Sequence, residues 1–128
     1  MRIALPAVLL PFLFACSAAQ RPATPDEPST LAAMLRAHLG LVETPLRPAL
    51  RLTHRVLREG HPRVAMNWMV VSTPSGETFV HEGGTGGFSS FMGLVPAAGR
   101  AAIVLSDTAL LARGGLGAIG MRLLEPAP

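Results

Sequence analysis

The densest group of residues that could serve chemistry runs from Val80 to Phe88 and reads VHEGGTGGF. Four glycines fill five consecutive positions directly after an apolar, strand-like segment. Backbone without side chains lets a ligand lie against it and lets N–H groups point at an anion or an oxyanion. A glycine-rich hairpin, in which the glycines only permit a tight turn, explains the same residues. Composition alone leaves both interpretations open.

The sequence that continues from this stretch, HEGGTGGFSSFMGLVPAAGRAAIVLSD, resembles the carboxy-terminal part of the β-lactamase-related serine hydrolases. That superfamily contains class C β-lactamases, penicillin-binding DD-peptidases and esterases. The resemblance lies in the order of the motifs: His-x-Gly, Thr-Gly-Gly-Phe, an apolar strand ending in proline, a short turn, and an aliphatic strand followed by Ser. It is strong over residues 64–107 and looser over 31–124, and Met66-Asn67-Trp68 occupies the place of the family's Gly-x-Gly-Trp strand.

The resemblance implies roles for five residues of the glycine-rich stretch. His81 stands at the Lys or His position of the family's third motif, which orients substrate and tunes the proton network, and an imidazole can do this near neutral pH. Gly83 matches the small position of that motif. Gly84 matches the strand position whose N–H forms one half of an oxyanion hole. Thr85 and Gly86 are the substrate-binding residues that the resemblance implies.

The residues that perform hydrolysis in that family are missing from this sequence. The family's acyl-enzyme forms on the Ser of a Ser-x-x-Lys motif, assisted by the Tyr of a Tyr-x-Asn motif, and this sequence contains no Lys and no Tyr. Binding and oxyanion stabilisation alone sustain only a residual rate. We therefore expect a truncated β-lactamase-family serine hydrolase, catalytically silent alone, whose intact relatives hydrolyse β-lactams, peptidoglycan peptides or esters.

Two alternatives stay open. The chain could be an exported module that binds the cell wall or a partner through the cleft wall from His81 to Gly87. It could equally be one half of a split enzyme, with the missing N-terminal half as a separate chain.

Composition and spacing exclude other chemistry. All eleven cations are Arg, which rules out a Walker A loop and a Schiff-base lysine, and a single Cys rules out an internal disulfide. The glycine-rich stretch matches the sequence pattern of a nucleophile elbow with Thr as the nucleophile. A nucleophile elbow connects a strand to a helix, however, whereas this stretch is followed by a predicted strand. The four histidines, His38, His54, His61 and His81, show no metal-ligand spacing and are expected to be unrelated surface residues. No metal and no cofactor is therefore expected.

A change in hydrophobic period divides the rest of the chain. Spacings of three and four predict a helix over about 31–39, ended by Gly40, and a second over about 47–58, ended by Gly60. Beyond residue 62 a period of two predicts four strands, over about 64–72, 77–82, 87–95 and 101–106, with turn residues at 73–76 and 96–99.

The stretch from Thr108 to Leu124 predicts a closing helix, weakened by four glycines. The expected fold class is therefore α+β: an antiparallel meander of about four strands with two N-terminal helices and a C-terminal helix. The resemblance implies that this is a truncated piece of the β-lactamase or DD-peptidase fold.

The amino terminus has the layout of an export signal. Residues 1–16 carry one cation, an apolar run and then small residues, and the run is shorter than the roughly 20 apolar residues that cross a bilayer. Leu13-Phe14-Ala15-Cys16 resembles a bacterial lipobox, which implies lipidation of Cys16; cleavage after Ala18 or Ala19 is the alternative. Residues 17–30 are rich in proline and predict an extended tether, which leaves 31–128 as a partial hydrolase domain.

These features define the expected surroundings of the protein. We expect export to the periplasm or cell envelope, with the membrane reached through a lipid anchor. The expected ligand is a β-lactam or a peptidoglycan-like peptide. A net charge of +3, carried by dispersed Arg residues without interleaved aromatics, gives no reason to expect a nucleic-acid partner.

Overall fold

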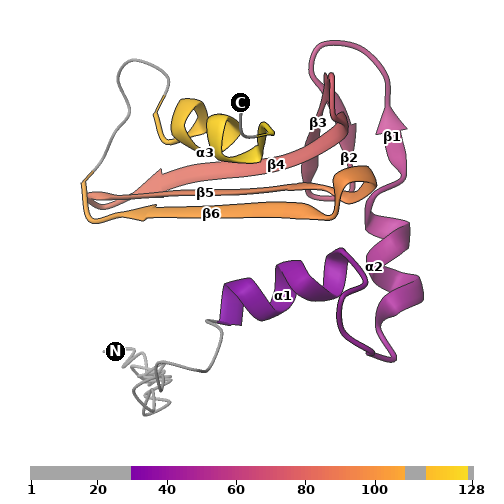
Figure 1. Cartoon of the computed structure of the whole chain (residues 1–128). Coiled ribbons are helices and arrows are strands. Elements are labelled where there is room, and N and C mark those ends of the chain that lie inside the picture. The colour runs from indigo at the N-terminus through magenta and orange to yellow at the C-terminus, as the bar shows by residue number, and fades with distance from the viewer. Residues whose placement is uncertain (1–29, 109–114, 127–128) are drawn as a thin grey trace, which may run out of the picture.

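The computed structural model describes residues 30–108 and 115–126. They form an α+β unit with one antiparallel sheet of six strands in chain order (Figure 1). The elements are α1 (Thr30–His38), α2 (Arg47–Thr53), β1 (Val56–Arg58), β2 (Arg63–Ala65), β3 (Trp68–Thr73), β4 (Gly76–Thr85), β5 (Phe88–Val95), the 3-10 helix η1 (Pro96–Ala98), β6 (Arg100–Ser106) and α3 (Gly117–Leu124).

The sheet lies between α1 on one face and α3 on the other (Figure 1). Successive side chains of a strand point to opposite faces, so the central strands supply two separate apolar clusters. The cluster on the α1 face consists of Leu35, Ala65, Trp68, Val70, Phe79 and Leu94. The cluster on the α3 face consists of Val80, Phe91, Val95, Leu116 and Leu124. Each helix therefore covers its own core.

The end of α1 confirms the expected stop at Gly40. Gly40 has a φ of 74°, in the left-handed region, and its N–H donates to the carbonyl of Ala37. The N–H of Leu41 donates to the carbonyl of Arg36. This pair of bonds is a Schellman motif, in which glycine serves because it adopts positive φ without strain.

The expected second helix over 47–58 is wrong in its second half. α2 ends at Thr53, and residues 56–58 form β1, which pairs Val56 with Ala65. None of the residues of α2 is buried, so the apolar stripe of this helix gains little from a further turn. Pairing with β2 supplies backbone hydrogen bonds instead.

The expected number of about four strands is also wrong, because the structure has six. The segment predicted as one strand over 64–72 is a hairpin of β2 and β3, joined by Met66 and Asn67. Asn67 has a φ of 65°, a conformation that Asn tolerates better than most non-glycine residues. The turns expected near 73–76 and 96–99 are present, with Gly76 and Gly99 at positive φ.

The expected closing helix is present in part. α3 spans Gly117–Leu124 and packs Leu116 and Leu124 against the sheet. The expectation for residues 109–114 lies outside the described residues, as do the expected signal, the expected lipidation at Cys16 and the expected tether up to residue 29.

Candidate functional site

The candidate residues lie on the half of β4 that extends beyond β3. Pairing with β3 ends at Met69 opposite Val80, whereas pairing with β5 continues until Thr85 lies opposite Phe88. In the described part of the chain, residues 81–85 therefore have a neighbouring strand on one side only. An unpaired strand edge presents N–H and C=O groups to an incoming segment.

Gly83, Gly84 and Thr85 share a shallow hollow on the sheet. It has a volume of about 380 Å³ and is also lined by Phe88, Ser89, Ser90, Leu105 and Ser106. A Cβ atom added at Gly83 would meet no atom within 4 Å. The structure thus gives Gly83 no packing reason to be glycine, and the space above it is open.

His81 lies in a neighbouring hollow rather than in that of the glycines. This second hollow has a volume of about 240 Å³ and is lined by Val64, Asn67, Trp68, Met69, Val80 and Glu82. His81 is exposed, two residues before Gly83 on the same strand. Among residues 30–108 and 115–126 it has no hydrogen-bond or ion-pair partner, so its imidazole is available to a ligand.

The hairpin interpretation accounts for the other two glycines. Gly86 and Gly87 join β4 to β5 with φ values of 52° and 100°. Two consecutive positive φ values are the requirement of the two-residue turn that matches strand twist. Gly86, expected as a substrate-binding residue, therefore has a structural role at the turn, whereas Gly83 and Gly84 lie in the strand itself.

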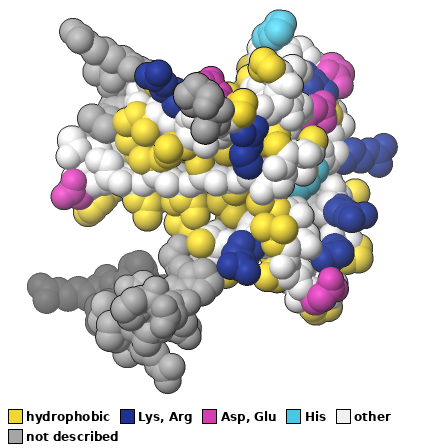
Figure 2. All heavy atoms as spheres, in the orientation of Figure 1, with side chains coloured by type: hydrophobic (Ala, Val, Ile, Leu, Met, Phe, Trp, Pro, Cys, Tyr) yellow, Lys and Arg dark blue, Asp and Glu magenta, His cyan; other side chains and the backbone are white. Residues whose placement is uncertain are grey.

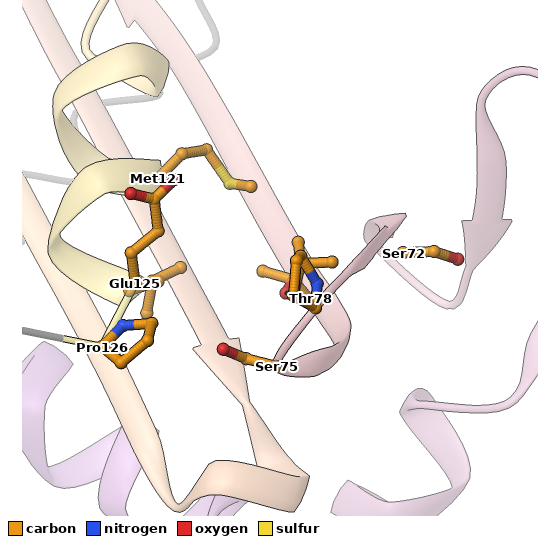
Figure 3. A pocket seen from close by; sticks show the side chains of 9 residues that line it. Ser72, Ser75, Thr78, Met121, Glu125 and Pro126 are labelled. Carbon is orange, nitrogen blue, oxygen red and sulfur yellow. Dashed lines mark hydrogen bonds between the residues drawn. The ribbon is translucent and has the colours of Figure 1, made fainter. Parts of the chain in front are cut away.

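A third hollow lies outside every expectation from the sequence. It has a volume of about 350 Å³ between the β3–β4 hairpin and the end of α3, and its lining consists of Ser72, Thr73, Pro74, Ser75, Thr78, Met121, Leu124, Glu125 and Pro126. In Figure 3 the side chain of Ser72 points away from α3, whereas Ser75 and Thr78 lie on the side of the hairpin that faces α3. Thr78 Oγ1 lies 3.1 Å from Thr73 Oγ1, and Ser75 Oγ accepts a hydrogen bond of 2.8 Å from Arg100. These hydroxyls stabilise the hairpin, and none of these contacts involves a base.

Two histidines form a pair that the sequence did not predict. His38 Nδ1 and His54 Nε2 lie 3.0 Å apart, where one ring donates its N–H and the other accepts. The Trp68 ring meets His38 edge-on at a centroid distance of 5.3 Å, and the Phe79 ring lies 4.7 Å from that of His54. The expectation of unrelated surface residues is therefore wrong for His38 and His54.

The signal for this pair was present in the hydrophobic pattern. His38 falls on the apolar stripe of α1 with Leu35, and His54 follows the apolar stripe of α2. Spacing could not reveal that two stripes from different helices meet. Within the described residues, no group of three or more His, Cys, Asp or Glu side chains could hold a metal ion. His61 and His81 are exposed, as expected.

Burial favours the neutral form of both members of the pair. It lowers the pKa of His38 below its ordinary value of 6.5, and it lowers the pKa of His54 in the same way, with repulsion from a charged His38 as a second cause. The unfolded chain therefore binds protons on these rings at a higher pH than the folded chain does. The stability that the pair contributes is complete above pH 6.5 and is lost as the pH falls through the lowered values.

We expect the free energy of unfolding to fall as the pH is lowered from about 8 to about 5. Urea titrations followed by the fluorescence of Trp68, the sole Trp in a chain without Tyr, measure it. The double variant His38→Leu, His54→Phe should flatten this dependence, whereas the control His61→Leu should keep it. A pH dependence that survives in the double variant would assign it to other groups.

In residues 30–108 and 115–126, no helix combines the length and the apolar character needed to cross a membrane.

The chain matches no protein-family model, no curated protein and no solved structure. The likeness to the β-lactamase-related hydrolases therefore rests on the motif residues of the sequence.

Proposed function

We propose that this chain is a segment of a β-lactamase-related serine hydrolase that binds an extended, peptide-like ligand along β4 and does not hydrolyse it alone. The observation that carries the proposal is the free side of β4 at residues 81–85, together with the open space above Gly83. An extended peptide can add to such an edge by main-chain hydrogen bonds, with its side chains in the adjacent hollows. A peptidoglycan peptide or a β-lactam, as the motif resemblance implies, is the ligand class proposed.

The chemistry around the hollow supports binding without turnover. Ser90 Oγ donates to the carbonyl of Gly83 at 3.5 Å rather than to a base. His81 lines the other hollow, and no histidine is among the described residues that line the glycine-lined hollow. Nucleophilic catalysis by a hydroxyl requires an adjacent base that removes its proton.

A Gly83→Val variant tests this proposal. We expect Val to leave the melting temperature unchanged or to raise it, because its Cβ meets nothing within 4 Å and Val favours strands. The same side chain would occupy the space of the ligand, so binding of a stem peptide ending in two D-alanines should weaken about tenfold or more. Binding is followed by amide chemical shifts of residues 81–85 in the full chain.

The control is Ser72→Val, which should leave peptide binding intact. Ser72 is an exposed residue on β3 that lines neither the glycine-lined hollow nor the hollow of His81. A chromogenic cephalosporin should be consumed no faster with the chain than in buffer. The proposal is contradicted if the wild-type chain does not bind the peptide, if Gly83→Val binds it equally well, or if the chain hydrolyses the cephalosporin.

A further inference from the structure

The two edges of the sheet differ in how they are protected from pairing. β1 spans three residues, its register shifts between Val56 and Arg58, and it ends on a charged residue. β6 spans seven residues, RAAIVLS, and pairs with β5 without a break in register. Its one charged residue, Arg100, stands at its start. A long, regular edge without charge, proline or bulge along its length is a site where another strand adds.

The edge of β6 is open in the described structure. No described strand pairs with β6 on the side opposite β5. Figure 2 shows backbone atoms along this part of the sheet, with hydrophobic side chains above and below them. The α1 face alongside β6 carries Leu105, which is 64% exposed. This edge thus combines free main-chain groups with exposed apolar area.

We propose that two copies of this chain associate through β6, with the two strands paired antiparallel about a twofold axis at Ile103. Ile103 is the middle residue of β6, so this register pairs the strand over its whole length. Antiparallel pairing about that axis places Ala101 of one copy opposite Leu105 of the other. The two contacts are identical by symmetry, as in any isologous dimer.

The surface beside Ala101 fits the side chain that this register brings to it. Between α1 and β6 lies an apolar groove of about 270 Å³, lined by Ala32, Leu35, Arg36, Leu39, Leu41, Gly99, Ala101, Ala102 and Ile103. Leu105 and Ala101 both lie on the α1 face, because residues of one strand two or four apart share a face. The exposed Leu105 of the second copy therefore enters this groove, and its apolar surface is removed from water.

The charges at the two ends of the strand match in the same register. Asp107 directly follows β6 and is exposed. The twofold pairing brings it beside Gly99 of the other copy, at the groove wall that contains Arg36. Arg36 is exposed and forms no ion pair within the described residues. A carboxylate from the second copy thus meets an available guanidinium.

A second copy of the chain is the partner that covers the β6 edge without exposing a new strand edge. Of the edges that remain in the described structure, β1 is short, bulged and charged, and the free side of β4 spans only residues 81–85, so we expect association to stop at the dimer. Seven paired residues and one side chain in each groove form an interface at the small end of the specific range. We therefore expect a dissociation constant in the micromolar range.

Sedimentation equilibrium of the full chain carrying Cys16→Ser, which excludes a disulfide, tests the proposal. We expect a reversible monomer–dimer equilibrium. Leu105→Lys should weaken the dimer by at least about tenfold, because the new ammonium group would enter an apolar groove beside Arg36. The matched control is Leu57→Lys on β1, which is 62% exposed at the opposite edge and should leave the equilibrium unchanged.

Charge reversal separates this register from other modes of association. Asp107→Arg should weaken the dimer, and adding Arg36→Asp to it should restore affinity. A chain that is monomeric at all concentrations overturns the proposal, and so does a dimer that Leu57→Lys disrupts and Leu105→Lys does not. Gly83→Val should leave the equilibrium unchanged, so failure of ligand binding along β4 and failure of dimerisation are distinguishable.

Discussion

Replacement of Gly120 by Ala should lower the free energy of unfolding by about 2–3 kcal/mol, although Ala is the better helix former. Gly120 is buried in α3, directly above the ring of Phe91 on β5. A Cβ atom at Gly120 would overlap that ring, whose side chain is itself only 2% exposed and has no room to move. The helix must therefore lift from the sheet, which also uncovers Leu124. A drop in melting temperature of about 10 °C or more is expected for a domain of this size.

The same substitution three residues earlier provides the control. A Cβ at Gly117 would meet the Glu82 carboxylate at 2.5 Å, but Glu82 is an exposed, flexible side chain that can swing away. Gly117→Ala should therefore be neutral or stabilise α3 by up to about 1 kcal/mol, through helix propensity alone. Equal destabilisation by the two variants would show that helix propensity, and not contact with Phe91, determines the result.

A double variant isolates the contact itself. Phe91→Leu alone should destabilise the α3-face cluster, because it removes buried aromatic area. In the Gly120→Ala background it also makes room for the new methyl group, so the two effects should couple by about 0.5–3 kcal/mol. Strict additivity in thermal or urea unfolding would contradict the close approach of α3 to β5.

Replacement of Leu94 by Ala should cost about 2–5 kcal/mol of unfolding free energy. Leu94 on β5 is 0% exposed and belongs to the cluster on the α1 face, with Leu35 and Phe79. Truncation leaves a cavity between the sheet and α1, since the surrounding strands are fixed by their hydrogen bonds. Because small domains are stable by only about 5–15 kcal/mol, this loss is a large part of the total.

Leu41→Ala is the matched control for Leu94→Ala. Leu41 is 59% exposed just after α1, and its truncation should change the unfolding free energy by less than about 0.5 kcal/mol. The urea midpoints of both variants, followed by Trp68 fluorescence, provide the comparison. Similar midpoints for Leu94→Ala and the wild-type chain would mean that the α1 face holds no packed core.

Local sequence determined the elements whose signals are contained within a few residues. The helix α1 was predictable from its apolar spacing, and its end at Gly40 was predictable because the bonds that end it lie within the same segment. The turn before Gly76 follows from residues that favour a reversal of the chain, and β5 and β6 follow from a period of two bounded by such turns. The α+β class was readable for the same reason.

Sequence alone could not place β1 or divide the segment from 64 to 72. Val56-Leu57-Arg58 fits both a helix end and a strand, and only its partner in β2 decides between them. Met66-Asn67 carries no glycine or proline to mark a turn, yet Ala65 and Trp68 face each other across it. In both cases the structure is decided by hydrogen bonds between two separate segments. The hydrophobic period of one segment gives no information about such pairing.

The candidate site divides in the same way. The sequence by itself determined that His81, Gly83 and Gly84 follow one another closely, and that no lysine or tyrosine accompanies them. The strand expected over 77–82 ends before the two glycines, and only the structure extends β4 to Thr85. Only the tertiary structure decided that β4 extends beyond the end of β3, so that His81 and the glycines line separate hollows. It also decided that the side chains of His38 and His54 contact each other. The reason is physical: residue types and local spacing are properties of one segment, whereas edges, hollows and buried pairs exist only once distant segments pack together.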